Sequence, residues 1–237
     1  MLIIERAFKT KPSVCVLASK PRKSVDKGHS GTAERILDAA EKLFADFGFD
    51  GVSLRQITRE AGVRLALANY HFGPKLELFR AVVRRRAEAL NAERFVLLEN
   101  LPADAAIEQV LHAFTAPFLE RSQRGGPGWK NYARVIAQIT NSPRWTPDIL
   151  AVEFDPVARV FLAHIQKIFP HTHEENLHWC FYFLLGAMTI TFAETGRVDS
   201  LSGGRFKATD LDAIHARMVP FLAAGFRALC GDPSPPR

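Results

Sequence analysis

Apolar side chains recur at helical spacing along most of this 237-residue chain, and this periodicity restricts its possible folds more than any other feature. From Thr32 onward, apolar residues return every three or four positions, as they do on one face of an α-helix. The alternation of apolar and polar residues that is typical of a half-buried strand does not occur with any strength. The sequence therefore predicts an all-α fold.

About nine helices are expected, separated by turns rich in glycine, proline and asparagine. Their predicted ranges are 33–47, 54–61, 65–71, 75–99, 104–122, 129–140, 147–169, 173–196 and 209–230.

The second and third of these helices are short and carry clear boundary signals. Ser53 and Gln56 have the spacing of a capping box, and Val52 and Ile57 that of a hydrophobic staple. Gly62 then interrupts the helical pattern for only a few residues, which indicates a tight turn before the next helix. Two short helices joined in this way predict a helix-turn-helix.

Composition indicates an ordinary globular protein, with 47% hydrophobic and 24% charged residues. The apolar stretches are much shorter than the roughly 20 residues that cross a bilayer, so we expect a cytoplasmic protein with no membrane partner. Cys15, Cys180 and Cys230 are too few and too scattered for a disulfide framework or a zinc site, and we interpret them as plain thiols.

The formal net charge of +6 is concentrated near the N-terminus. Residues 1–30 contain seven lysines and arginines against two acidic residues, and lack a sustained helical period. We expect a disordered basic leader, either a solvated tail or an arm that grips phosphates. Residues 31–75, in contrast, contain six basic and six acidic residues. Any binding of DNA there must depend on locally placed cations.

The stretch from Thr32 to Phe79 resembles the DNA-binding domain of TetR-family regulators. The matching segments are Gly48-Phe49-Asp50-Gly51-Val52-Ser53, Gln56-Ile57-Thr58-Arg59-Glu60-Ala61-Gly62-Val63, Tyr70-His71-Phe72, Lys75 and Leu78-Phe79. The resemblance implies a three-helix helix-turn-helix domain followed by a larger helical ligand-binding and dimerisation domain. The implied division is a leader at 1–30, a DNA-binding domain at 31–76, a ligand-binding and dimerisation domain at 77–230 and a tail at 231–237.

The resemblance also implies how the helix-turn-helix would meet operator DNA. Base edges would be faced by Arg55, Arg64, Leu65, Ala66 and Leu67, and phosphates would be gripped by Thr32, Ser53, Asn69, Tyr70, His71 and Lys75. The segment Leu65-Ala66-Leu67 departs from the family's usual small polar residues and lysine. Because leucines two positions apart on a short helix cannot both face the core, at least one of them should be exposed. Asn69-Tyr70-His71-Phe72-Gly73 is similar to a subgroup that includes regulators of fatty-acid metabolism.

In the C-terminal domain the resemblance implies a cavity for an apolar or amphipathic effector. The candidate lining residues are His112, Phe114, Phe118, Trp129, Tyr132, Ile136, Phe161, His164, Tyr182 and Phe183. The two histidines could hydrogen-bond a ligand head group or be satisfied structural residues.

The last two predicted helices are implied to form a homodimer interface, a four-helix bundle between subunits. The candidate interface residues are Phe181, Leu184, Leu185, Met188, Phe192, Ile214, Met218, Phe221, Leu222 and Phe226. Gly186 and Gly225 lie inside these helices, where close approach of a second helix would compensate for their low helix propensity.

The resulting expectation is a ligand-released repressor that binds a palindromic operator as a homodimer, without a cofactor, a metal or catalytic activity. Two other classes stay open. A metal-dependent enzyme would have to use the cluster His171, His173, Glu174, Glu175 and His178. An architectural DNA-binding protein would use the same helix-turn-helix without an effector. Repression and activation are not separable from the sequence.

Overall fold

A computed structural model describes residues 27–231 of the chain. The predicted leader lies outside these residues, except that its last four residues belong to the first helix, α1 (Lys27–Phe47). The predicted tail, apart from Gly231, also lies outside them. In the described part of the chain all regular elements are helices, and none of these is long and apolar enough to cross a membrane.

The N-terminal unit consists of α1, α2 (Leu54–Glu60), α3 (Leu65–Phe72) and the first turns of α4 (Lys75–Glu99). Its core is formed by fully or almost fully buried side chains, which include Ile36, Phe44, Ile57, Ala68 and Phe79.

The boundaries of this unit agree with the local signals in the sequence. The Gln56 backbone N–H donates to Ser53 Oγ at 3.3 Å, and the Ser53 backbone N–H donates to Gln56 Oε1 at 2.8 Å. The predicted capping box is therefore confirmed. Gly48 and Gly62 adopt φ values of 71° and 64°, which would be strained for a residue with a side chain. The two glycines therefore let α1 and α2 end abruptly.

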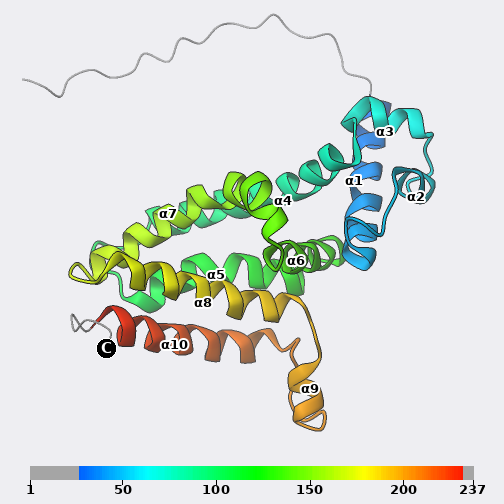
Figure 1. The fold of residues 1–237 in the computed structure, drawn as a ribbon. Helices are drawn as coiled ribbons and strands as arrows, with labels where there is room; N and C mark the ends of the chain where they lie inside the picture. The colour runs from blue at the N-terminus through cyan, green and yellow to red at the C-terminus, as the bar shows by residue number, and fades with distance from the viewer. Residues whose placement is uncertain (1–26, 232–237) are drawn as a thin grey trace, which may run out of the picture.

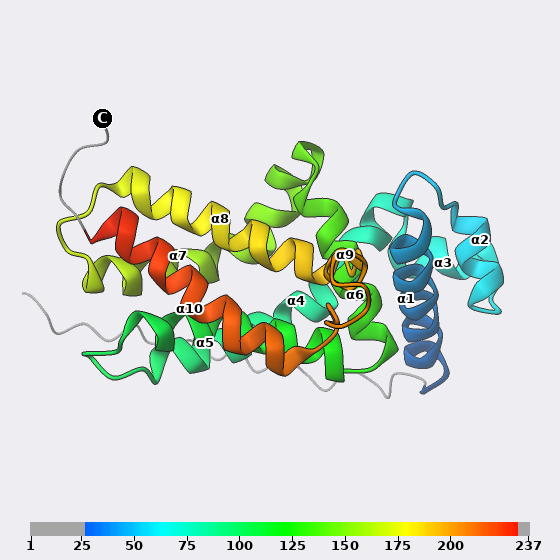
Figure 2. The ribbon, with the colours of Figure 1, turned by 90° about the horizontal axis from the view of Figure 1, so that it is seen from below.

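The C-terminal unit is a larger helical bundle that α4 enters from the N-terminal unit (Figure 1). Its further elements are α5 (Ile107–Arg124), α6 (Pro127–Thr140), a 3₁₀ turn (Pro143–Trp145), a π turn (Thr146–Leu150), α7 (Ala151–Ile168), α8 (Glu174–Phe192), α9 (Arg197–Leu201) and α10 (Leu211–Cys230). Helices α8 and α10 lie side by side along one side of this bundle (Figures 1 and 2).

The region between α8 and α10 differs from the expectation. The predicted helix 173–196 ends at Phe192, because Glu194 and Gly196 take left-handed backbone angles of 45° and 64°. The short helix α9 then occupies a stretch that was expected to be a turn, and it projects away from the bundle (Figure 1).

The two units meet where α1 packs against α6, and α4 belongs to both. Gln138 Nε2 on α6 donates to the Ala45 carbonyl at 2.9 Å, and Arg134 pairs with Asp46 at 2.9 Å. Tyr132, on the same helix, donates its hydroxyl to the Val83 carbonyl of α4 at 3.2 Å. Helix α6 is thereby fixed to both N-terminal elements that border the C-terminal unit.

Candidate functional site

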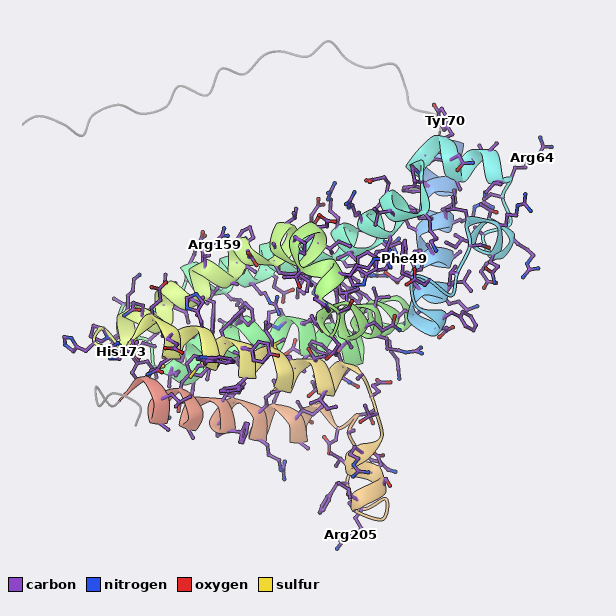
Figure 3. All side chains as sticks on the ribbon, viewed as in Figure 1. Phe49, Arg64, Tyr70, Arg159, His173 and Arg205 are labelled. Atoms are coloured by element: carbon purple, nitrogen blue, oxygen red, sulfur yellow. The ribbon has the colours of Figure 1, made fainter. Side chains whose placement is uncertain are left out.

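The outward face of α3 is the first candidate surface. Arg64, Ala66, Asn69 and Tyr70 are exposed, and the Tyr70 side chain keeps 76% of its surface. Arg64 and Tyr70 project from the end of the molecule that lies away from the C-terminal bundle (Figure 3). Ala66 and Tyr70 are four positions apart, so they share one side of the helix. This side of α3 is free to meet another macromolecule.

The two leucines of α3 do not behave as expected. Leu65 and Leu67 are both half-buried, and neither is exposed. The reason is the orientation of α3: Ala68 points into the core and is fully buried, which places the leucines on the flanks of the helix. The exposed tip is therefore formed by Ala66 and Tyr70.

Charge in the N-terminal unit is separated in space although its sum is close to zero. Five of its acidic residues pair with arginines of α4, α6 or the 3₁₀ turn: Glu34, Asp38 and Glu41 with Arg85, Glu41 also with Arg86, Asp46 with Arg134 and Asp50 with Arg144. The sixth, Glu60, pairs with Lys42 at 2.6 Å. Arg55, Arg59 and Arg64 are exposed and form no ion pair within residues 27–231. The acidic side thus faces the C-terminal unit, and these three arginines remain available to a polyanion.

Lys75, predicted as a phosphate contact, already makes two hydrogen bonds within the described chain. Its Nζ donates to the carbonyl oxygens of Phe49 and Val52, each at 2.9 Å, and lies 4.1 Å from the centroid of the Phe49 ring. The side chain is half-buried. Its ammonium group holds the turn between α1 and α2.

The remaining predicted phosphate contacts are dispersed around this surface. Ser53 is exposed and caps α2, and His71 is half-buried beside Tyr70, with a ring separation of 5.2 Å. Thr32 lies on α1, where its hydroxyl accepts a hydrogen bond from Arg35 at 3.4 Å.

A cavity of about 110 Å³ lies within the C-terminal bundle. It is bounded by α4 to α8 and is lined by Arg94, Phe114, Phe118, Ile136, Thr140, Leu150, Phe154, Asp155, Ala158, Phe181, Leu185, Met188, Thr189 and Phe192. Of the predicted cavity residues, Phe114, Phe118 and Ile136 line it. Phe181, Leu185, Met188 and Phe192, predicted for the dimer interface, line it as well.

Two further predicted cavity residues form the layer behind its wall. Phe161 is fully buried and packs against Phe114 at a ring separation of 4.7 Å. Tyr132 is also fully buried, 5.7 Å from the ring of Phe118. Both support the lining and do not reach the cavity.

Five predicted cavity residues lie elsewhere. Trp129 packs beneath the guanidinium groups of Arg86 and Arg121. His112 faces His215 in a separate shallow groove, and His164 borders the loop after α4. Tyr182 and Phe183 are exposed on α8, on the side turned away from the cavity. Helix α8 is apolar on nearly all sides, so periodicity could not show which side faces inward.

Arg94 is the cavity residue that sequence reasoning missed. Only 3% of its surface is exposed, and its Nε donates to the Phe114 carbonyl at 2.8 Å. Burial lowers the pKa of the guanidinium to about 10, so the group remains charged at neutral pH. Its position, four residues after Leu90 and four before Leu98, was the available signal, because it places an arginine on the apolar stripe of α4.

The predicted dimer residues also need a correction. Six of them are buried within the chain itself: Leu184, Met188, Phe192, Met218, Leu222 and Phe226. Phe181, Leu185 and Ile214 are half-buried, whereas Phe221 is exposed. The exposed apolar surface of these helices consists of Trp179, Tyr182, Phe183 and Ile190 on α8 and Phe221 and Leu229 on α10, which we call the outer face. Gly186 and Gly225 have open space where a Cβ would be.

The histidine-rich segment at the start of α8 does not assemble a metal centre. His173 lies at the opposite end of the molecule from Tyr70 (Figure 3). Among residues 27–231, no group of three or more His, Cys, Asp or Glu side chains is arranged to hold a metal ion. The described residues therefore offer no metal site for the alternative of a metal-dependent enzyme.

Comparison with known proteins supplies the family. The model described as "Bacterial regulatory proteins, tetR family" matches residues 36–82, and that described as "Tetracyclin repressor-like, C-terminal domain" matches residues 112–225, so that together they cover more than half of the chain. The chain belongs to the TetR family. This TetR-family regulator has the predicted all-α fold, which is confirmed, and its matched families are regulators and not enzymes.

Curated TetR-type relatives match parts of the chain. The HTH-type transcriptional regulator SrpR of Pseudomonas putida is 39% identical over 62 residues, which are 26% of this chain and 29% of SrpR. The negative regulator IcaR of the biofilm operon icaADBC, from Staphylococcus aureus (strain Newman), is 24% identical over 110 residues, which are 46% of this chain and 54% of IcaR. The chain thus spans about half or less of the length of these relatives.

Solved structures of the TetR type share the fold. A TetR-like regulator from Rhodococcus sp. RHA1 has a TM-score of 0.58 at 17% identity, with 85% of this chain and 97% of that chain covered. The regulator FadR from Bacillus subtilis, solved in complex with stearoyl-CoA, has a TM-score of 0.57 at 13% identity, with coverages of 81% and 98%.

Proposed function

We propose that this TetR-family protein is a repressor that binds a palindromic DNA operator as a homodimer and is released by a small effector. The observation that carries the proposal is the outward face of α3 with Arg64, together with Arg55 and Arg59 of the adjoining helix α2. These three arginines are exposed and have no ion-pair partner in the described chain. Exposed arginines beside a protruding short helix are suited to the phosphates and base edges of duplex DNA.

The geometry supports a division of roles on this surface. Arg64 and Ala66, at the start and tip of α3, would contact base edges together with Arg55, and the half-buried Leu65 and Leu67 would add apolar contact at the flanks. Asn69, Tyr70 and His71 would grip phosphates, together with Ser53 at the start of α2 and Thr32 on α1.

Dimerisation would use the outer face of α8 and α10. Trp179 and Phe183 stack at a ring separation of 6.0 Å, and Tyr182 packs edge-on against Trp179 at 5.8 Å. A large exposed aromatic group of this kind marks an interaction surface on a protein. Gly186 and Gly225 would let the partner's helices approach closely, in a four-helix bundle with two-fold symmetry.

Helix α6 offers a route from the effector to the DNA. Ile136 and Thr140 line the cavity, while Gln138 and Arg134 of the same helix hold α1. An effector that fits the cavity in only one position of α6 would shift the balance between two positions of α1. Such a cavity favours a ligand-responsive regulator over a ligand-independent architectural protein. We place this regulator in the cytoplasm, with its DNA.

Selection of bound sequences from random duplex DNA tests the proposal. The full-length protein should enrich a palindrome whose half-sites are about one helical turn apart, roughly 34–36 Å. Enrichment of no sequence, or of a single half-site, would contradict a dimeric operator-binding protein. Phe47→Ala serves as a control, because this exposed side chain of α1 belongs to neither the α3 surface nor the outer face.

A further inference from the structure

Arg94 places a positive charge in the wall of an otherwise mostly apolar cavity. Only 3% of the surface of Arg94 is exposed. Its Nε–H donates a hydrogen bond to the Phe114 carbonyl, whereas its Nη atoms have no hydrogen-bond partner within residues 27–231. A guanidinium carries five N–H donors, so most of the donor capacity of Arg94 is unused.

No carboxylate of the described chain forms an ion pair with Arg94, although the charge of Glu93 offsets the burial of the guanidinium in part. Glu93, its neighbour in sequence, pairs with Arg121 at 2.5 Å. Asp155 contributes to the cavity lining but is half-exposed and pairs with Arg159 at 3.4 Å. Two aromatic rings lie near the guanidinium: the centroid of Phe114 is 4.2 Å away and that of Phe118 is 6.0 Å away. A buried charge without an ionic partner is costly, and rings compensate it only in part.

We propose that the cavity binds a small organic anion, a monocarboxylate with an apolar body, whose carboxylate pairs with Arg94. The inference rests on the proposed effector role of this cavity and specifies the chemistry of its ligand. A carboxylate matches the planar fork of the guanidinium with two parallel hydrogen bonds. The apolar body would lie among Phe154, Phe181 and Phe192.

The size of the cavity limits that body. Its volume of about 110 Å³ is of the same order as the roughly 150 Å³ of an apolar cavity that binds benzene. One aromatic ring or a short alkyl chain therefore fits. The hydroxyls of Thr140 and Thr189, 3.3 Å apart, give the lining a further polar pair.

The test compares anionic ligands with neutral ligands of the same shape. Benzoate and hexanoate, with benzamide and hexanamide as neutral partners, are titrated calorimetrically into the full-length protein. We expect at least one carboxylate to bind about ten-fold or more tightly than its amide. In Arg94→Met this preference should disappear, and in Arg94→Lys it should persist in part. The matched control Arg159→Met removes an exposed charge near Asp155 and should keep the full preference.

The inference is overturned if the amides bind as tightly as the carboxylates, or if the preference for the carboxylate survives in Arg94→Met. It is also overturned if neither carboxylate binds at millimolar concentration. Because methionine removes a buried charge and keeps an apolar chain of similar length, Arg94→Met should fold, with a melting temperature at least equal to that of the wild type in the absence of ligand. If that variant does not fold, the ratio of carboxylate to amide affinity in the wild type and in Arg94→Lys decides.

The inference and the proposed function fail in different ways. Loss of the Arg94-dependent preference, with the operator still bound and the chain still dimeric, overturns only the ligand chemistry. A wild-type protein that does not bind duplex DNA overturns the proposed function, whatever the cavity binds. Benzoate or hexanoate that binds through Arg94 should also lower the affinity for the selected duplex.

Discussion

The ammonium group of Lys75 donates a hydrogen bond of 2.9 Å to the Phe49 carbonyl and lies 4.1 Å from the centroid of the Phe49 ring. The same nitrogen also donates to the Val52 carbonyl, so that the first residue of α4 fixes the turn between α1 and α2. Phe49 in turn packs on Phe79 and Trp145, at ring separations of 5.1 and 5.0 Å, where the two units of the molecule meet (Figure 3).

Lys75→Met should therefore destabilise the fold and leave the electrostatics of DNA binding unchanged. Loss of the donor leaves two carbonyl groups unsatisfied, which should cost about 1–3 kcal/mol in the free energy of unfolding. Denaturant unfolding measures the loss, and the slope of log affinity against log salt concentration should stay at the wild-type value. Arg64→Met should leave the free energy of unfolding unchanged and reduce the magnitude of the salt slope by about one for each Arg64 that contacts the DNA. A reduced slope in Lys75→Met would restore its role as a phosphate contact.

Glu41 is a buried anchor between α1 and α4. Its carboxylate is 1% exposed and receives hydrogen bonds from Arg85 and Arg86. Glu41→Gln should leave Arg86 without a carboxylate partner and Arg85 with only the exposed Glu34 and Asp38, and lower the free energy of unfolding by about 3 kcal/mol. Asp50→Asn breaks the exposed pair with Arg144 and is expected to cost less than about 1 kcal/mol. Equal losses in the two variants, measured by urea unfolding, would contradict the importance of the buried pair.

The outer face predicts which substitutions separate the subunits. Phe221 is 73% exposed on α10, so Phe221→Glu should leave the folded chain intact and place two carboxylates in the proposed interface. Sedimentation at micromolar concentration should show monomers for this variant and dimers for the wild type. Phe47→Glu changes another exposed phenylalanine, on α1, and should stay dimeric. A dimeric Phe221→Glu would move the interface to another surface.

Cys180 and Cys230 form a buried thiol pair between α8 and α10, with their sulfur atoms 3.8 Å apart. The hydrogen bond between the two thiols favours the thiolate of Cys230 and lowers its pKa. Cys180→Ala removes the donor and leaves the burial, so the pKa of Cys230 should rise. Thiolate absorbance against pH, recorded with Cys15→Ser in both proteins, measures the shift. An unchanged or lower pKa would show that the neighbouring thiol is not the cause.

The features that sequence reasoning predicted correctly are local. The capping box of Ser53 and Gln56 involves residues three positions apart, and the left-handed Gly48 follows a clear apolar stripe. Their interactions depend on the nearby chain, so a single sequence specifies them. The same applies to the all-α fold and to the boundaries of α4.

The features that it missed depend on contacts between distant segments. The family resemblance implies a cavity position for Tyr182 and Phe183 and an interface position for Leu184. Because α8 is apolar on nearly all sides, only its packing against α5, α6, α7 and α10 decides which side is buried. The pairs of α1 carboxylates with arginines of α4 and α6 join residues 44 to 88 positions apart. Cys180 and Cys230 meet across 50 positions for the same reason.

The affinity of Ala66→Glu for the selected duplex tests the central claim most directly. Ala66 is exposed at the tip of α3, so a carboxylate there should not disturb the core but should be repelled by DNA. Ala103→Glu adds the same charge at an exposed site in the loop between α4 and α5 and serves as the control. We expect Ala66→Glu to bind the duplex at least about 100-fold more weakly than Ala103→Glu, a difference of roughly 2.7 kcal/mol, at equal thermal stability and with both variants dimeric. Equal affinities of the two variants would contradict the claim that this face of α3 reads the operator.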